Sequence, residues 1–207
     1  MTKRTQAIAV ALLFSVAASL AFAQLPNIPQ FSADMKTTGQ DGHTGAGKMY
    51  WGSGRIRFDM NAQSHDVSMI NDSAKKTTYM IMHQQRMYME MGANNPMGPR
   101  VRMPDIKPYD PDNPCANEEG YTCKKVGAET VNGRSCDKWE FTGSQGKRTA
   151  WIDQRLHFPI RIVSPDGTTT DVTNVKEGSQ PASLFEVPAG YTKMDLGGMM
   201  GGSKRPD

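Results

Sequence analysis

The stretch YMIMHQQRMYMEM, residues 79–91, places a methionine at every second position on either side of a short polar interruption. Successive side chains of a β-strand point to opposite faces of a sheet, so this alternation predicts two strands rather than a helix. If the two glutamines form the turn between the strands, Met82 lies opposite Met87 and Met80 lies opposite Met89. The methionines then share one face of a hairpin.

The same period of two recurs along the chain between Gly, Asn, Asp and Pro residues, and no segment after residue 23 has a sustained helical period. The sequence therefore predicts a mostly β protein with antiparallel strands. The expected strands are Phe31–Thr38, Gly45–Trp51, Arg55–Asn61, His65–Asn71, Lys76–His83, Arg86–Met91, Tyr121–Val131, Arg134–Thr142, Lys147–Asp153, Pro159–Ser164 and Thr168–Lys176. A short helical turn is expected at 182–185.

Two further hairpins allow their registers to be predicted. A two-residue turn at residues 53–54 places Trp51 opposite Ile56 and Met49 opposite Phe58, which collects the large apolar side chains on one face. A one-residue slip would scatter these side chains over both faces.

The Asn-Gly pair at residues 132–133 is the strongest turn signal, because a type I′ turn needs positive φ at both central residues. This turn predicts Val126 opposite Trp139 and Cys136 opposite Glu129.

The first 23 residues have the pattern of a secretory signal peptide, with Lys3 and Arg4, an apolar run over residues 7–20 and Ala21-Phe22-Ala23 before the expected cleavage site. Cleavage lowers the formal net charge from +3 to +1, because it removes two basic residues and no acid. A charge this small does not indicate nucleic-acid binding. The expected location is the periplasm or the secreted fraction.

The three cysteines would then meet an oxidising compartment, where a disulfide is the default expectation. The short CANEEGYTC loop favours a bond between Cys115 and Cys123, and Cys136 is a competing partner for either of them. Neither the cysteines nor the four scattered histidines have the spacing of a zinc site, so no metal ligand is assigned.

The expected organisation is one β domain over residues 24–193, with a long proline-rich loop at 92–120, followed by a disordered Gly/Met tail at 194–207. The loop is expected to move over an open side of the sheet and to be its least protected part.

The segments GKMYWGSGRIRFDM, GAETVNGRSCDKWEF, AWIDQRLHFPIRI and SLFEVPAGY resemble a family of secreted bacterial proteins of unknown function in the LolA/LolB-type lipoprotein-carrier superfamily. The resemblance covers most of the chain after the signal peptide. It implies a half-open β-barrel, a single curved antiparallel sheet whose concave apolar face holds lipoprotein acyl chains.

The residues that match the family pattern lie at strand ends and read as architectural: Trp51, Arg57, Trp151, Ile152, Asp153, Phe185, Pro188 and Gly190. The chain departs from the carriers in two ways. It lacks a long helix after the signal peptide, and it contains the proline-rich loop, which would have to cover the mouth of the cavity instead.

Three interpretations of the methionine pattern remain open at this stage. The side chains can fill a packed core, line an open face that accepts acyl chains of varied shape, or bind the soft ion Cu(I) through their thioethers. His83 does not support the Cu(I) interpretation, because it points to the opposite face. The expected ligand-binding residues are Met49, Trp51, Phe58, Met80, Met82, Met87 and Met89.

No catalytic residue or cofactor is expected, because the chain has neither a Gly-x-Ser-x-Gly elbow nor a phosphate-binding loop. The functional hypothesis is a monomeric, non-enzymatic binding protein for an acyl chain or a lipidated partner. The alternatives are a structural or envelope-stress interaction protein without a cavity, or a Cu(I)-binding protein. Arg55, Arg57, Lys75 and Lys76 could form a mild basic rim that gives peripheral contact with a membrane.

Overall fold

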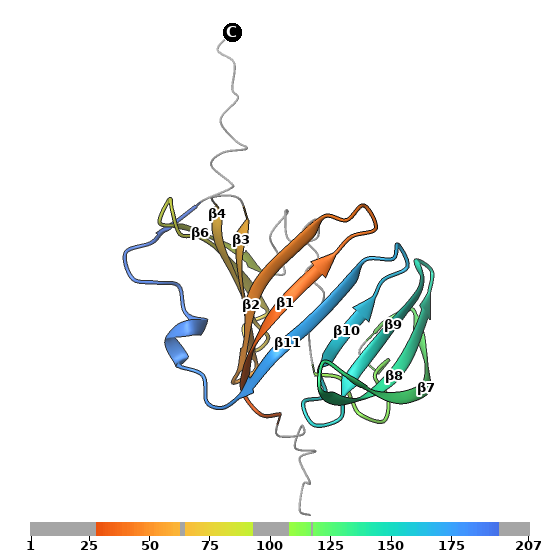
Figure 1. Cartoon of the computed structure of the whole chain (residues 1–207). Coiled ribbons are helices and arrows are strands. Elements are labelled where there is room, and N and C mark those ends of the chain that lie inside the picture. The colour runs from red at the N-terminus through yellow and green to blue at the C-terminus, as the bar shows by residue number, and fades with distance from the viewer. Residues whose placement is uncertain (1–27, 63–64, 93–107, 117, 195–207) are drawn as a thin grey trace, which may run out of the picture.

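A single bent sheet forms the core of the computed structural model, which describes residues 28–62, 65–92, 108–116 and 118–194 (Figure 1). The predicted signal peptide, most of the proline-rich loop and nearly all of the tail lie outside these residues. In the described ranges, no helix has the length and apolar character needed to cross a lipid bilayer.

All eleven predicted strands are present. The elements are β1 (Phe31–Thr38), β2 (Thr44–Gly52), β3 (Arg55–Ala62), β4 (His65–Asp72), β5 (Thr77–Met82), β6 (Met87–Gly92), β7 (Tyr121–Val131), β8 (Arg134–Gly143), β9 (Gly146–Asp153), β10 (Pro159–Val163), β11 (Thr169–Glu177), the 3₁₀ turn η1 (Ala182–Phe185) and β12 (Thr192–Lys193).

The strand order is β12-β6-β5-β4-β3-β2-β1-β11-β10-β9-β8-β7. Two meanders are therefore joined where β1 pairs with β11, and the sheet ends at β12 and β7 without closing. The sheet bends so that β3–β6 and β7–β9 flank the central strands (Figure 1). This confirms a mostly β, half-open fold.

The predicted registers of the hairpins that turn at residues 53–54 and 84–85 are confirmed. Met49 pairs with Phe58 and Trp51 with Ile56, and the methionines pair across β5 and β6 as expected. Ser53 and Gly54 have φ values of 52° and 71°, and Asn132 and Gly133 have 50° and 77°. Positive φ at both central residues is the type I′ geometry that matches strand twist.

The prediction that Val126 lies opposite Trp139 is wrong. The register from the Asn-Gly turn holds as far as Gly127, which pairs with Lys138, but Lys125 then pairs with Trp139. Val126 is the extra residue of a β-bulge and is exposed. A bulge adds one residue to one strand, which counting residues outward from a turn cannot detect.

The sheet is also not purely antiparallel, because the two-residue β12 pairs parallel with β6. This strand ends the segment 182–194, called the strap below, which runs outside β3–β6 (Figure 1). Its Leu184, Phe185, Val187 and Tyr191 pack against Ile70 and Ile81. The strap thus covers the convex, outer face of this half of the sheet.

The part of the main core that comes from β1, β2 and β3 lies on the opposite, inner face. The buried residues of the whole core come from the central strands, from the β7–β8 hairpin and from the turn before β10: Phe31, Ala33, Met49, Trp51, Ile56, Phe58, Val131, Cys136, Leu156, Phe158, Ile160 and Val172. Phe31 and Phe158 meet edge to face, with ring centroids 5.4 Å apart.

Candidate functional site

Three rows of side chains cross the inner face from β1 to β6, because the registers of five neighbouring strand pairs align. The first row is Met35, Gly47, Met60, Val67, Met82 and Met87. The second row is Ala33, Met49, Phe58, Met69, Met80 and Met89. The third row is Phe31, Trp51, Ile56, Asn71, Thr78 and Met91. We call the nine methionines of these rows the methionine face.

Exposure changes across the methionine face. Met49 and Met69, both in the second row, are buried, at 0% and 6% exposure. Met35 and Met60 in the first row are partly exposed, and so are the methionines of the β5–β6 hairpin other than Met91. The face therefore runs from packed core into a partly exposed thioether surface.

The seven predicted ligand-binding residues fall into two groups by their exposure. Met49, Trp51 and Phe58 belong to the buried core, whereas Met80, Met82, Met87 and Met89 are partly exposed. Met35, Met60 and Met69 share the same face but were not predicted. Their registers would have indicated them, had the cross-strand pairs been followed beyond the hairpins.

The outer face behind these rows carries a polar network around Ser68, which is fully buried. The Ser68 hydroxyl donates to Asp59 Oδ1 at 2.6 Å and accepts from Arg57 Nη2 at 2.9 Å. His83 Nε2 lies 2.7 Å from the same hydroxyl, and its Nδ1 lies 2.9 Å from the Tyr191 hydroxyl. Since the Ser68 proton goes to Asp59, Nε2 of His83 is the donor in this contact.

This network is not a nucleophilic triad, although it contains serine, histidine and aspartate. The carboxylate contacts the serine instead of orienting the imidazole, and a guanidinium donates to the oxygen that would attack. Arg57 also donates to the Leu184 carbonyl at 2.9 Å. The network therefore fastens the strap to the sheet.

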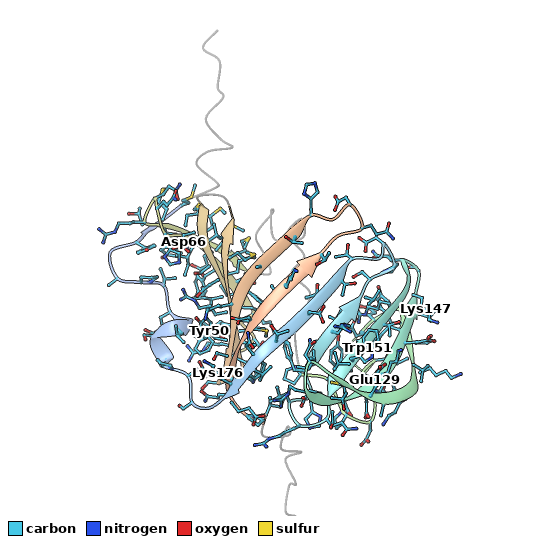
Figure 2. All side chains as sticks on the ribbon, in the orientation of Figure 1. Tyr50, Asp66, Glu129, Lys147, Trp151 and Lys176 are labelled. Carbon is cyan, nitrogen blue, oxygen red and sulfur yellow. A yellow bond between two sulfur atoms is a disulfide. The ribbon has the colours of Figure 1, made fainter. Side chains whose placement is uncertain are left out.

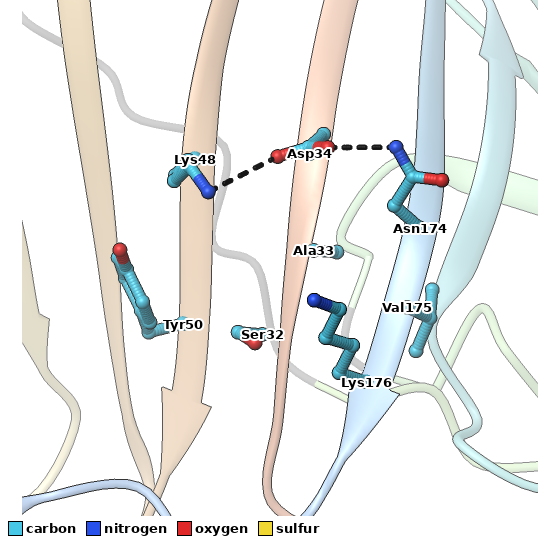
Figure 3. A pocket seen from close by; sticks show the side chains of 8 residues that line it. All are labelled: Ser32, Ala33, Asp34, Lys48, Tyr50, Asn174, Val175 and Lys176. Atoms are coloured by element: carbon cyan, nitrogen blue, oxygen red, sulfur yellow. Dashed lines mark hydrogen bonds and ion pairs between the residues drawn. The ribbon is translucent and has the colours of Figure 1, made fainter.

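A hollow of about 370 Å³ lies on the outer face beside this network. It is lined by residues from β1, β2 and β11, including Ser32, Tyr50 and Lys176 (Figure 3). Its Asp34 accepts from Asn174 at 2.8 Å and lies 3.7 Å from Lys48. The charges of Asp34 and Lys48 thus neutralise one another.

Three of the four residues suggested for a basic rim have partners within the protein. Arg57 is engaged in the outer network, and the Arg55 guanidinium lies 5.3 Å from the centre of the Phe185 ring in the strap. Lys75 faces Asp72 at 3.7 Å. At the far end of the outer face, Trp151 donates to Glu129 at 2.5 Å (Figure 2).

A second apolar cluster lies on the inner face at the β8–β9 end of the sheet. It consists of Trp139, Phe141, Ala150 and Ile152. Cross-strand pairs connect Thr37 in turn to Thr170, Ile162, Ala150 and Trp139. Because paired residues lie on the same face, this cluster and the methionine face share one side of the sheet.

The second cluster is covered by the described residues of the proline-rich loop, 108–116 and 118–120, which we call the cap. The Tyr109 ring lies 5.7 Å from the Phe141 ring, and Pro114 is fully buried. Burial raises the pKa of Tyr109 to about 12, with smaller effects from Arg148 and Glu118.

The predicted disulfide between Cys115 and Cys123 is confirmed, and it joins the cap to β7. Cys136 is free and buried opposite Glu129, as the turn register predicted. Burial, followed by the charge of Asp153, raises the pKa of the Cys136 thiol to about 11. A thiol with so high a pKa carries little thiolate at neutral pH.

Within the described ranges, no three His, Cys, Asp or Glu side chains come together in a way that could hold a metal ion. The thioethers of the methionine face are soft donors, and Cu(I) is an ion that such donors suit.

The molecule is an open, bent sheet with an apolar inner face. Comparison with known proteins shows the family to which it belongs. The chain belongs to the DUF4412 family, a domain of unknown function, which matches residues 32–157. This confirms the expected membership of a family of unknown function. No curated protein matches the chain.

Two solved structures share the fold at low sequence identity, and a third is less similar. An uncharacterized conserved protein from Thermus thermophilus is similar over 81% of this chain and 91% of its own, with 10% identity and a TM-score of 0.54. MucB is similar over 78% of this chain but only 58% of its own, with 15% identity and a TM-score of 0.51. A LolA superfamily protein from Nitrosomonas europaea is similar over 77% of this chain and 91% of its own, with 11% identity and a TM-score of 0.37.

Proposed function

We propose that this protein is an exported, non-enzymatic binding protein that holds an acyl chain, free or attached to a partner, on its methionine face. The observation that carries the proposal is the aligned set of methionines that runs from the core into a partly exposed surface. Methionine has three rotatable bonds and a polarisable sulfur, so such a surface can repack around chains of different shape.

The energetics favour a ligand on this surface over exposure to water. Removing apolar surface from water contributes about 25 cal/mol per Å², and Met80, Met82, Met87 and Met89 each have apolar surface left to cover. A bound acyl chain would lie along the first two rows and contact side chains from β3 to β6.

Export is part of the proposal and rests on two observations. The first 23 residues carry the signal-peptide pattern, and the Cys115–Cys123 disulfide belongs to an oxidising compartment. The polar network around Ser68 gives no reason to propose catalysis, since its serine is buried and its donors oppose nucleophilic attack.

The proposal is tested by replacing Met80, Met82, Met87 and Met89 together, once with leucine and once with serine. Leucine conserves volume and apolarity, so the variant should fold and bind a fluorescent long-chain fatty acid like the wild type. Serine introduces hydroxyl groups and removes apolar surface, so it should abolish uptake while circular dichroism shows an intact sheet.

Other outcomes identify the alternatives. If the serine variant unfolds and the wild type takes up no fatty acid, the methionines are packed core and the protein has no cavity. If the wild type binds Cu(I) tightly, the leucine variant does not, and neither takes up fatty acid, the thioethers form a metal site.

A further inference from the structure

The guanidinium of Arg148 places a positive charge on the apolar inner face at the capped end of the sheet. Its partner across the ladder is Phe141, and its guanidinium carbon lies 4.4 Å from the centre of the Phe141 ring and 4.9 Å from that of Tyr121. A guanidinium that lies over aromatic rings keeps the N–H groups in its own plane available for a carboxylate.

The carboxylate that meets this guanidinium comes from the cap. Glu118 Oε2 lies 2.9 Å from Arg148 Nη2, and Glu118 Oε1 lies 3.4 Å from the Tyr109 hydroxyl. The ion pair is short, but Nη2 is buried and no acceptor among the described residues meets it with hydrogen-bond geometry. Glu118 thus neutralises the charge of Arg148 but leaves hydrogen-bond donors of the guanidinium unused.

A carboxylate beside an apolar surface is also what a fatty acid presents. Next to Arg148, the inner face continues through the cluster of Phe141, Trp139, Ala150 and Ile152, against which Tyr109 and Cys115 of the cap pack. The cap is held over them by the disulfide, by the Tyr109 N–H bond to the His157 carbonyl at 2.8 Å, and by the Glu118 contact.

We propose that Arg148 and the cluster around Phe141 form a second binding site, for the carboxylate and chain of a long-chain fatty acid, and that Glu118 occupies its anion position in this structure. The fatty acid carboxylate replaces that of Glu118 on Arg148, and its chain replaces the cap on Trp139 and Phe141. The site goes beyond the proposed function, since none of its residues belongs to the methionine face.

The test is a titration of the full chain with a fluorescent long-chain fatty acid and with the alcohol of the same chain length. Glu118→Ala should bind one further molecule of fatty acid per protein than the wild type, and no further alcohol. Glu119→Ala is the matched control, because Glu119 is the exposed neighbour in the cap. Adding Arg148→Gln to Glu118→Ala should weaken binding at the new site about ten- to a hundredfold, the effect of losing a charged hydrogen bond.

A further variant tests the case in which the cap still covers the site after Glu118 is removed. Cys115→Ser with Cys123→Ser, combined with Glu118→Ala, frees the cap and should show the same additional fatty acid. The proposal is overturned if neither the single nor the triple variant binds more fatty acid than Glu119→Ala, or if the gain survives Arg148→Gln. The serine substitutions on the methionine face should leave the additional binding intact, which separates this site from the proposed function.

Discussion

Gly45 and Gly47 occupy the same strand, β2, but a side chain would meet different surroundings at the two positions. A Cβ atom at Gly47 would lie 2.4 Å from the Asp59 carbonyl oxygen on β3, whereas nothing lies within 4 Å of a Cβ at Gly45. Backbone cannot move aside as the end of a flexible side chain can. The glycine in the first row is therefore required by the close approach of two strands.

Gly47→Ala should consequently lower the free energy of unfolding by roughly 1–3 kcal/mol, the usual cost of overpacking. Gly45→Ala, the control, should stay within about 0.5 kcal/mol of the wild type. Urea unfolding followed by tryptophan fluorescence measures both. Equal midpoints for the two variants would contradict the proposed clash.

Asp137 is a single residue that should make the stability of the folded protein depend on pH. Burial alone would raise the pKa of its carboxyl, but hydrogen bonds from Lys125 at 2.6 Å and Gln154 at 2.7 Å, together with the Lys125 charge, outweigh burial and lower the pKa below its usual 3.8. A carboxyl with a lowered folded-state pKa stabilises the protein above its unfolded pKa. The contribution is lost as the pH falls through the folded-state pKa.

Asp137→Asn should therefore cost up to about 1 kcal/mol at pH 7 and progressively less below pH 3.8. Thermal unfolding of both proteins at pH 7 and at about pH 3 tests this expectation. Asp112→Asn, at an exposed position in the cap, controls for the loss of one charge. A difference between wild type and Asp137→Asn that is unchanged or larger in acid would contradict the assignment.

At the scale of elements, the strap depends on one aromatic anchor. Phe185 is 4% exposed, and its ring edge would lie only 3.0 Å from a Cβ at Gly52, so the absence of a side chain there makes room for it. Leu184 is partly exposed beside it. The fit between Phe185 and Gly52, which are far apart in sequence, positions the strap over Ile70 and Ile81.

Phe185→Ala should destabilise the protein by about 3–5 kcal/mol, because it removes a buried aromatic side chain and leaves a cavity. Leu184→Ala should cost clearly less, since that side chain retains contact with water. Chemical denaturation compares the two variants, and hydrogen exchange should show faster exchange in β12 of Phe185→Ala. If both substitutions cost the same, Phe185 is not the anchor.

Elements set by local chemistry were predictable from the sequence, and those set by distant contacts were not. The Ser53-Gly54 and Asn132-Gly133 turns determined their hairpins because positive φ is a property of the turn residues themselves. The bulge at Val126 and the parallel pairing of β12 left no local pattern. The position of the cap depends on Tyr109 meeting Phe141 across the sheet, which residue spacing does not encode.

The candidate site was predictable to the same extent. Alternation placed Met80, Met82, Met87 and Met89 on one face of a hairpin, and the structure confirms their pairing. Alternation could not show how far each side chain is covered, because burial depends on which strands lie opposite. Arg148 was missed, since nothing near it in sequence indicates that its partner is Glu118 in the cap.

At the scale of the whole molecule, one inner face contains three apolar regions with different surroundings. The central region is the protein's own core, the β8–β9 end is covered by the disulfide-linked cap, and the β5–β6 end presents partly exposed methionines. The outer face behind the methionines is already covered by the strap. The methionine face is therefore the part of the inner face where an acyl chain is proposed to bind without displacing another segment.

Native mass spectrometry of the protein, expressed from its full sequence and purified from the cell envelope without detergent, gives the decisive test of acyl-chain binding. We expect a protein species that carries the additional mass of an acyl lipid. It should be present in the wild type and in the variant with leucine at positions 80, 82, 87 and 89, and absent from the variant with serine at these positions. A wild-type protein that carries no lipid mass, or a lipid mass that the serine variant retains, would contradict this expectation.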